Sequence, residues 1–438
     1  MNGLLTARSQ MGLSLAFHII FAVIGVSLPL MMTIAEWRWL RTREPVYKTL
    51  AKRWAKGAAI LFGIGAVSGT VLSFELGLLW PRFMEKAGAV IGMPFSLEGF
   101  AFFTEAIFLG IYLYGWDRTP ELLHFLSGGI VALSGLTSAV FVTFVNAWMN
   151  TPSGFLFANG EFTQIEPLKA MLSPASIPEA VHMVLAAYCA VGFATAGVHA
   201  WLMLRRGRNG FDEVALSIAL AVGGVAVLAQ GVSGDALARM VARTQPAKLA
   251  ALEGQFQTET GAPLRLGGLP DLQQRTTKYA LEIPYGLSLL AFHDPHATVK
   301  GLNSIPETEW PPVLWVHICF QIMVGLGSAL SLVALLGAWL AWKRHAFSAH
   351  RWFLKLLVFC GPLGLIALEA GWCVTELGRQ PWIVSGILKT SDAVTKVPNL
   401  EVPFLLVSAL YCVLGAVVLW LLWVHVIADP NSGDVEAL

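Results

Sequence analysis

Long apolar segments alternate with short polar connections along the chain, a pattern typical of a protein that crosses a membrane many times. Each segment, with its flanks, is long enough as a helix to cross a hydrocarbon layer about 30 Å thick. We predict nine membrane-spanning helices over residues 10–35, 54–79, 95–115, 121–148, 178–204, 213–234, 311–341, 352–377 and 400–428. The pattern therefore predicts an all-α polytopic membrane protein.

One connection is much longer than the others, between the sixth and seventh predicted helices. It mixes scattered charges with Leu, Phe and Tyr, so we expect a partly folded external loop rather than a disordered one. The chain then divides into four parts, which are helices one to six (1–234), the external loop (235–310), helices seven to nine (311–428) and a short cytoplasmic tail (429–438).

Composition supports a membrane protein. Of the 438 residues, 56% are hydrophobic and 13% are charged, whereas soluble proteins carry about 25% charged residues. The net charge of +1 gives no field that would attract nucleic acid. The five cysteines lie in or beside apolar segments without a CxxC pair, so we expect small core residues rather than disulfides. The first apolar segment is too long for a signal peptide.

Basic residues gather in alternate short loops, which fixes a predicted orientation because such loops face the cytoplasm. They follow the first, fifth and seventh predicted helices. The residues are Arg38, Arg41, Arg43, Lys48, Lys52, Arg53, Arg205, Arg206, Arg208, Lys343, Arg344 and Arg351. We therefore expect the N-terminus outside and the C-terminus in the cytoplasm.

In this orientation, ionisable groups and soft donors fall at a common depth, in the outer half of the bilayer. They are His18, Glu98, Glu105, His182, His317, Met323, Glu369 and Glu376. Any one of them could be a hydrogen-bonded core residue or a packing methionine. Ionisable groups inside a membrane are nevertheless costly and usually mark functional sites. Their shared depth favours a cofactor or proton site over separate structural roles.

The residue types in this set indicate which cofactor the site could hold. Histidine and methionine are axial ligands of haem, whereas this set would make a poor zinc site. Glu98 and Glu105 are seven residues apart and share one helix face, as proton-conducting carboxylates do. These residues favour a membrane redox protein with buried haem. The alternatives are a proton-coupled transporter lacking haem, and a passive cytochrome anchor that binds only low-spin haem.

Seven short motifs, in this order, carry a resemblance to a known family. They are Arg8-Ser9-Gln10 followed by His18, Glu98-Gly99 with Glu105, Asn146-Ala147-Trp148-Met149, Val181-His182, Gln321-Ile322-Met323-Val324, Gly371-Trp372, and Gly378-Arg379-Gln380-Pro381-Trp382. Over nearly its whole length the chain resembles subunit I of cytochrome bd-type quinol oxidases. Its external loop is short, as in the short Q-loop branch, and Gln321 with His317 resembles the branch described as cyanide-insensitive oxidase.

The resemblance implies three haem groups with ligands at matching positions. His182 and Met323 would be the axial ligands of a low-spin haem b. His18 would bind one high-spin haem, and Glu376 would be the carboxylate ligand of the other. One of these high-spin groups would be haem b, and the other haem d or a third haem b in its place.

The resemblance also assigns residues to proton transfer and quinol oxidation. Glu98 would face the open side of the His18 haem, and Glu105 would be the next member of a proton path. Trp372 would lie between haems, and Arg379 would offset haem propionates or the carboxylate ligand. In the external loop, two further residues match positions assigned to quinol oxidation. These are Lys248 and Glu253.

The implied enzyme is an electrogenic quinol:oxygen oxidoreductase that uses ubiquinol or menaquinol. It would oxidise quinol at the outer face of the bacterial cytoplasmic (inner) membrane and reduce dioxygen to water with cytoplasmic protons. A proton motive force would then form without a pump. The implied partners are a homologous subunit II, small single-helix subunits and membrane lipid, with no nucleic acid.

Overall fold

The computed structural model describes residues 3–343 and 347–427, and this part of the chain is mostly helical. Nine of its helical segments are long and apolar enough to cross a membrane. They are α1 (Gly3–Thr42), α2 (Pro45–Leu79), α3 (Pro81–Tyr114), α4 (Glu121–Asn150), α6 (Ser176–Arg206), α7 (Gly210–Thr244), α10 (Val313–Trp342), α11 with α12 (Arg351–Cys360 and Leu363–Gly378), and α14 (Glu401–Leu422) continued by a π-helical turn (Trp423–Ile427). The predicted all-α fold is confirmed.

Several helices are longer than the apolar segments that predicted them. Helices α2 and α3 begin at Pro45 and Pro81, well before the predicted starts at residues 54 and 95. Proline suits the first helical position, where its missing N–H is not needed. Helix α7 continues to Thr244, so the external loop begins after that residue and not at 235. Hydropathy finds the stretch that lies in lipid, whereas polar helix ends extend beyond it.

The eighth span is one predicted helix but two observed ones, because α11 ends at Cys360 and α12 begins at Leu363. Pro362 at the break lacks the N–H that a continuous helix would use. Gly361 at the same break lies against Gly197 of α6, where an added Cβ would approach the Gly361 Cα within 2.9 Å. The break therefore lets the two backbones touch.

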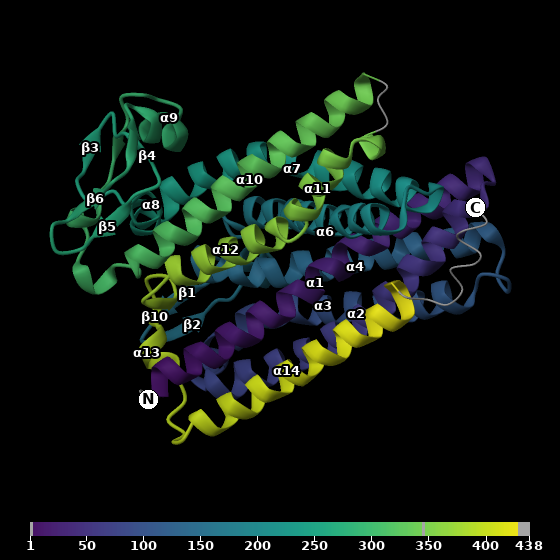
Figure 1. Ribbon diagram of the computed structural model, residues 1–438. Helices are drawn as coiled ribbons and strands as arrows, with labels where there is room; N and C mark the ends of the chain where they lie inside the picture. The colour runs from purple at the N-terminus through teal and green to yellow at the C-terminus, as the bar shows by residue number, and fades with distance from the viewer. Residues whose placement is uncertain (1–2, 344–346, 428–438) are drawn as a thin grey trace.

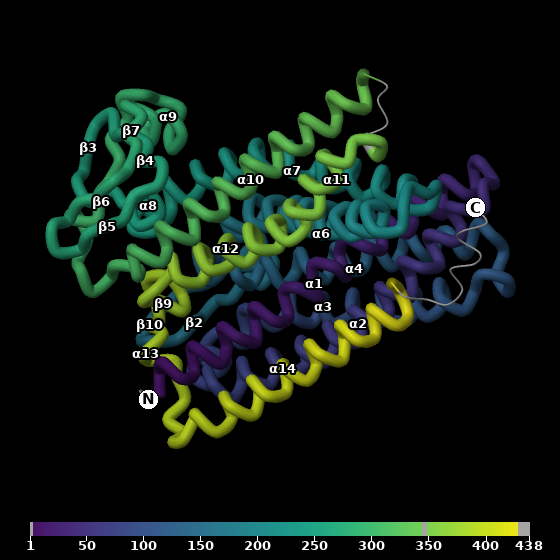
Figure 2. Tube along the Cα trace, viewed as in Figure 1, coloured from purple at the N-terminus to yellow at the C-terminus, as the bar shows by residue number. Residues whose placement is uncertain are grey.

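The long helices lie side by side in one bundle (Figures 1 and 2). Helices α1 to α4 pack as neighbours, while α6 packs on α7, α11 and α12, and α10 packs on α7 and α12. Helices α1 and α4 also contact α6 and join the two groups. At the α6–α7 contact, a Cβ on Gly192 would reach the Gly223 Cα at 2.5 Å. Small residues thus permit close helix packing, as is usual in membranes.

The external segment between α7 and α10 is folded. It contains α8 (Pro246–Glu253), α9 (Gly286–Phe292), two 3-10 turns (Leu302–Ser304 and Glu307–Glu309) and three antiparallel strand pairs. The pairs are β3 (Glu259–Thr260) with β8 (Thr298–Val299), β4 (Leu264–Leu266) with β7 (Leu281–Ile283), and β5 (Leu269–Asp271) with β6 (Thr276–Lys278). Its apolar core is continuous with Val313 and Val316 of α10, so the segment is fixed to the bundle.

The other extramembrane elements are short. They are β1 (Leu156–Ala158) paired with β2 (Glu161–Thr163), α5 (Pro167–Met171), a 3-10 turn (Phe347–Ala349), β9 (Trp382–Val384) paired with β10 (Leu388–Lys389), and α13 (Thr390–Ala393). Figure 1 shows both strand pairs at the end of the bundle that carries the external segment. All five cysteines are free, but only Cys189 and Cys360 are buried as core residues, whereas Cys373 and Cys412 are exposed in this chain. The predicted tail at 429–438 lies outside the described residues.

Candidate functional site

The four predicted metal ligands come from four different helices, α1, α6, α10 and α12. Helices α1, α6 and α10 start, and α12 ends, at the end of the bundle beside the external segment (Figure 1). His182 and Glu376 are within about two turns of that end, while His18 and Met323 lie deeper. The fold therefore gathers these residues in one half of the bundle, as their predicted common depth requires.

His18 is held in the tautomer that suits a metal ligand. Its Nδ1 lies 3.0 Å from the Ser68 hydroxyl, which itself donates to the Ile64 carbonyl at 2.9 Å. Because that hydroxyl hydrogen is used, Ser68 accepts the hydrogen of Nδ1, and the Nε2 lone pair is left to bind. Gly69 lies against the ring, since a Cβ there would be 3.0 Å from the His18 Cε1.

His182 repeats this arrangement on another pair of helices. Its Nδ1 is 3.0 Å from the Ser233 hydroxyl, which donates to the Gln230 carbonyl at 3.1 Å. The Nε2 lone pair accepts from the Gln230 amide at 3.0 Å, so Gln230 occupies the position that a metal would take. Neither serine was identified from sequence, because each lies about 50 residues from its histidine and no local spacing connects them.

Glu376 is held by Arg379, whose Nη2 donates to Oε2 at 2.7 Å, and by the amide of Asn146. Arg379 is only 5% exposed, and its Nε and Nη1 have no partner among the described residues. Near Met323, a Cβ on Gly371 would lie 3.1 Å from the sulfur. The absent side chain of this glycine leaves room for the thioether, so the Gly371-Trp372 motif bears directly on the predicted ligand.

These observations fit a porphyrin-bound iron better than a bare metal ion. Within the described residues, no three His, Cys, Asp or Glu side chains cluster closely enough to hold a metal. A porphyrin supplies four ligands itself and needs only one or two from the protein. The unpartnered nitrogens of Arg379 are suitable donors for propionates.

A chain of hydrogen bonds connects Glu376 to Lys248 in the external segment. Asn146 donates to Glu376, and Asn150 donates to Asn146 at 3.0 Å and to Glu179 at 3.1 Å. The Asn150 carbonyl oxygen in turn accepts from the Lys248 ammonium at 3.4 Å. The sequence predicted the two end residues for separate roles, but it gave no signal that Asn150 joins them through Asn146.

Lys248 and Glu253 are both buried, on opposite sides of α8. Five positions on a helix turn through about 500°, which leaves the two side chains about 140° apart. Burial lowers the pKa of Lys248 to about 8, an effect that the Glu179 carboxylate opposes. Burial also raises the pKa of Glu253 to about 8, against the influence of Arg265. Both groups can therefore exchange protons near neutral pH.

The two predicted proton-path glutamates lie on α3 and face α4. Glu98 accepts a hydrogen bond from the Ser138 hydroxyl of α4 at 3.1 Å. Glu105 is 5% exposed and packs against two glycines, since a Cβ on Gly135 would be 3.3 Å from its Oε1 and one on Gly25 3.7 Å. The Thr143 hydroxyl, also of α4, donates to the backbone of its own helix.

Residues 6–430 match the family described as cytochrome bd terminal oxidase subunit I. The chain belongs to this family. A protein of Bacillus subtilis (strain 168) named "Putative cytochrome bd menaquinol oxidase subunit I" is 40% identical, over 100% of this chain and 99% of that protein. From the same organism, cytochrome bd ubiquinol oxidase subunit 1 is 31% identical over 96% of this chain and 93% of its own length.

A solved structure gives the same result. The bd oxidase from Geobacillus thermodenitrificans has a TM-score of 0.93 and 42% identity, covering 98% of this chain and 100% of that one. The resemblance carried by the motifs is thereby confirmed, together with the nine-helix fold. Membership of the cytochrome bd family makes haem the expected cofactor, and the donor set described above fits it.

His317 and Gln321 have structural partners in this family member. The ring nitrogens of His317 lie 2.7 Å from the Leu252 carbonyl and 3.1 Å from the Gly267 carbonyl. Gln321 accepts from the Gly267 N–H at 2.9 Å and donates to the Arg265 carbonyl at 3.1 Å. Both side chains of α10 therefore hold the external segment in place, and the His317 nitrogens are already engaged.

Proposed function

We propose that this chain is the haem-bearing catalytic subunit of a terminal oxidase that oxidises quinol at the outer membrane face and reduces dioxygen to water with cytoplasmic protons. The observation that carries the proposal is the hydrogen-bonded chain from Lys248 in the external segment to Glu376 and Arg379. It connects the position expected to handle quinol with a position expected to hold haem. The relatives named as menaquinol and ubiquinol oxidases support the same substrates.

Four side chains would hold the cofactors. His182 and Met323 would bind a low-spin haem b, and His18 and Glu376 would bind the two high-spin groups, haem b and haem d or a third haem b. When bound, these groups supply one-electron transfer and the reduction of dioxygen. The serine partners of both histidines keep Nδ1 protonated, so each ring presents Nε2 as the ligand atom.

Quinol oxidation releases two electrons and two protons, and the chain's own residues would take the protons. Lys248 in its neutral form and Glu253 in its ionised form are each proton acceptors, and both have a pKa of about 8. The folded external segment covers them, since Lys248 is 5% and Glu253 4% exposed. The burial of Lys248 and Glu253 would keep bulk water away from the hydroxyl groups of the bound quinol.

Glu105 and then Glu98 would deliver protons taken up from the cytoplasm for water formation. Opposite-side release and uptake separates charge without a pump, against about 2.3 kcal/mol per charge per 100 mV. Apolar side chains of α10 and α14, including Leu332, Trp339, Leu405 and Trp420, are exposed in this single chain. Membrane lipid, the homologous subunit II and small single-helix subunits would cover such surfaces.

A spectrum of the purified complex tests the proposal. We expect a reduced-minus-oxidised difference spectrum with low-spin haem b and high-spin bands, a far-red haem d band being sought explicitly, and quinol-dependent oxygen consumption. Met323→Leu should convert the low-spin species to high-spin. A colourless protein would contradict the proposal and favour the proton-coupled transporter, while low-spin haem without oxygen consumption would favour a passive cytochrome.

A further inference from the structure

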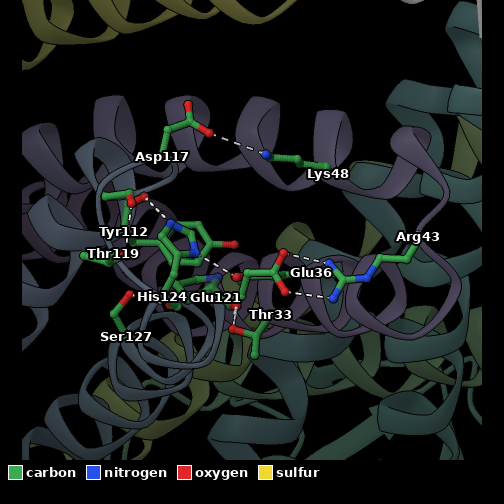
Figure 3. Close-up of polar contacts among 12 residues, drawn as sticks. Thr33, Glu36, Arg43, Lys48, Tyr112, Asp117, Thr119, Glu121, His124 and Ser127 are labelled. Atoms are coloured by element: carbon green, nitrogen blue, oxygen red, sulfur yellow. Dashed lines mark hydrogen bonds and ion pairs between the residues drawn. The ribbon is translucent and has the colours of Figure 1, made fainter.

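A second buried polar cluster lies at the other end of the same helices, and the proposed function does not use it (Figure 3). It consists of Glu36 near the end of α1, Tyr112 near the end of α3 and His124 near the start of α4. His124 Nδ1 is 2.7 Å from Glu36 Oε1, and its Nε2 is 2.9 Å from the Tyr112 carbonyl. All three residues are at most 2% exposed.

The cluster can hold a proton that is free to move. A carbonyl only accepts, so His124 Nε2 must carry its hydrogen. The Nδ1–Oε1 contact then holds one proton, which can lie on the histidine or on Glu36. Two further atoms are buried without a hydrogen-bond partner in the described structure, Glu36 Oε2 and the Tyr112 hydroxyl oxygen, although these two groups interact electrostatically. Unsatisfied buried atoms of this kind are unusual in a purely structural pair.

The chain contains a structural pair for comparison, at the same end of the bundle. His199 Nδ1 lies 2.7 Å from Asp212 Oδ1, with both residues at most 6% exposed. Here the His199 Nε2 accepts from Trp54 at 3.3 Å, and Asp212 Oδ2 accepts from Asn209 at 2.7 Å. The proton is thus fixed on Nδ1, and neither side chain has an unpartnered buried atom among the described residues. The two pairs have the same nitrogen–oxygen distance of 2.7 Å, but only the Glu36–His124 pair is free to exchange its proton.

The cluster lies on the helix face of α3 that carries the proton-path glutamates. Glu98, Glu105 and Tyr112 follow at seven-residue intervals, so they share that face. Two helical turns, or about 11 Å, separate Glu105 from Tyr112.

The neighbouring helices repeat the alignment. On α1, Gly25 touches Glu105 and Glu36 follows eleven residues later, about 20° from the same face. On α4, Gly135 touches Glu105 and His124 precedes it by the same interval. The contact region between α1, α3 and α4, here called the α1–α3–α4 seam, therefore contains the cluster near one end and Glu105 about two helical turns away.

Solvent approaches the cluster from its own end. The ring of Trp116 lies 4.1 Å from that of His124, centroid to centroid, and also lines a surface cavity of about 350 Å³. Asp117 lines the same cavity and pairs with Lys48 at 3.6 Å, while Arg43 pairs with Glu121 at 2.7 Å (Figure 3). One aromatic ring thus separates His124 from water.

We propose that Glu36, His124 and Tyr112 form a proton-loading site that feeds Glu105 from the cytoplasm, an inference that rests on the proposed function. A proton from cytoplasmic water binds the Glu36–His124 pair and leaves along the α1–α3–α4 seam to the Glu105 carboxylate. No electron is transferred in this step. The only bonds that break and form are those to the transferred proton.

The test uses the complete oxidase complex in vesicles, with quinol as donor and a dye that reports proton uptake. Glu36→Gln removes the carboxylate that shares the proton, so we expect steady-state oxygen consumption and proton uptake to fall at least about tenfold. Single-turnover reduction of the low-spin haem by quinol should not change. The matched control, His199→Gln in the structural pair, should stay within about twofold of wild type.

A second variant, Tyr112→Phe, tests whether the losses in Glu36→Gln arise only from misfolding. It removes only the hydroxyl that interacts with Glu36 and keeps the buried ring, so the melting temperature should stay close to that of wild type, while proton uptake should slow severalfold. Wild-type proton uptake in both Glu36→Gln and Tyr112→Phe would overturn the inference, as would losses that match those of His199→Gln. A wild-type complex without quinol-dependent oxygen consumption would overturn the proposed function, and this inference with it.

Discussion

At the scale of single residues, the position of one hydrogen decides whether a histidine can bind a metal. Ser68 and Ser233 each donate to a backbone carbonyl and must therefore accept from the histidine beside them. The same side chain without that partner could adopt either tautomer. The sequence predicted His18 and His182 as ligands from depth and resemblance, but their orientation depends on serines distant in the chain.

Ser233→Ala should weaken retention of the haem expected at His182. Loss of a partner that orients a metal ligand typically costs about 10- to 100-fold in affinity. The measurement is the amount of low-spin haem that remains with the purified complex after washing. Ser217→Ala is the matched control, because Ser217 lies on the same helix and bonds only to the Glu213 backbone. Equal haem content in the two variants would contradict this role for Ser233.

If Lys248 and Glu253 accept the protons of quinol, the rate of its oxidation should depend on pH in a particular way. Glu253 ionises and Lys248 loses its proton as pH rises through about 8, so both become proton acceptors in the same range. If both act, the rate of quinol oxidation below pH 8 should rise up to about 100-fold per pH unit, and Glu253→Gln should reduce this to about tenfold. Steady-state kinetics between pH 6 and about 9 measure the slope. An unchanged slope in the variant would exclude Glu253 as an acceptor.

At the scale of elements, Asn150 joins helices α4 and α6 to the external segment. Its amide donates to Asn146 and Glu179, and its carbonyl accepts from Lys248. Gly378 contributes to the same junction, because a Cβ there would lie 2.8 Å from the Lys248 side chain. The glycine of the Gly378–Trp382 motif is therefore required for packing against the external segment, a reason that the motif alone did not reveal.

Asn150→Ala should uncouple the external segment from Glu376. Leaving buried polar groups without a partner costs about 1–3 kcal/mol, although Gln245 still accepts from Lys248 at 3.2 Å. We expect a lower melting temperature and quinol oxidation slowed about tenfold or more. Asn303→Ala is the control, since Asn303 accepts from exposed Arg275 at 3.3 Å. Similar quinol kinetics in the two variants would argue against a functional junction.

Gln321 illustrates why a substitution cannot be interpreted from sequence alone. From the sequence, Gln321 was linked only to a branch of the family, through a resemblance that it shares with His317. In the structure both ends of the amide bond the external-segment backbone at Arg265 and Gly267. Gln321→Arg would therefore break two hydrogen bonds as well as add a charge, and its effect on a redox potential would not isolate the charge.

At the scale of the whole molecule, the sequence predicted the spans but not the contacts between them. Hydropathy reports where a helix meets lipid and gave all nine spans, while the basic loops gave the predicted depth of His18 and Met323. Contacts such as Glu36 with His124 join helices 88 residues apart, and no local period encodes them. His124 consequently had no predicted role, although it is among the least exposed polar residues.

Turnover should move charge across the whole bundle in one direction. Helices α1 and α6 have basic residues in their last turns, and Lys343 follows α10, all at the end of the bundle opposite the external segment (Figure 1), which favours placing Lys248 and Glu253 outside. Each electron taken from quinol outside should then release one proton there and consume one from inside. In sealed vesicles with the external segment outward, quinol should acidify the outside by about one proton per electron and make the inside negative, as opposite-side chemistry without a pump requires. An uncoupler should abolish the potential and speed turnover. A ratio near zero would mean that the quinol protons leave on the inner side, and a ratio near two would require a pump that none of these residues provides.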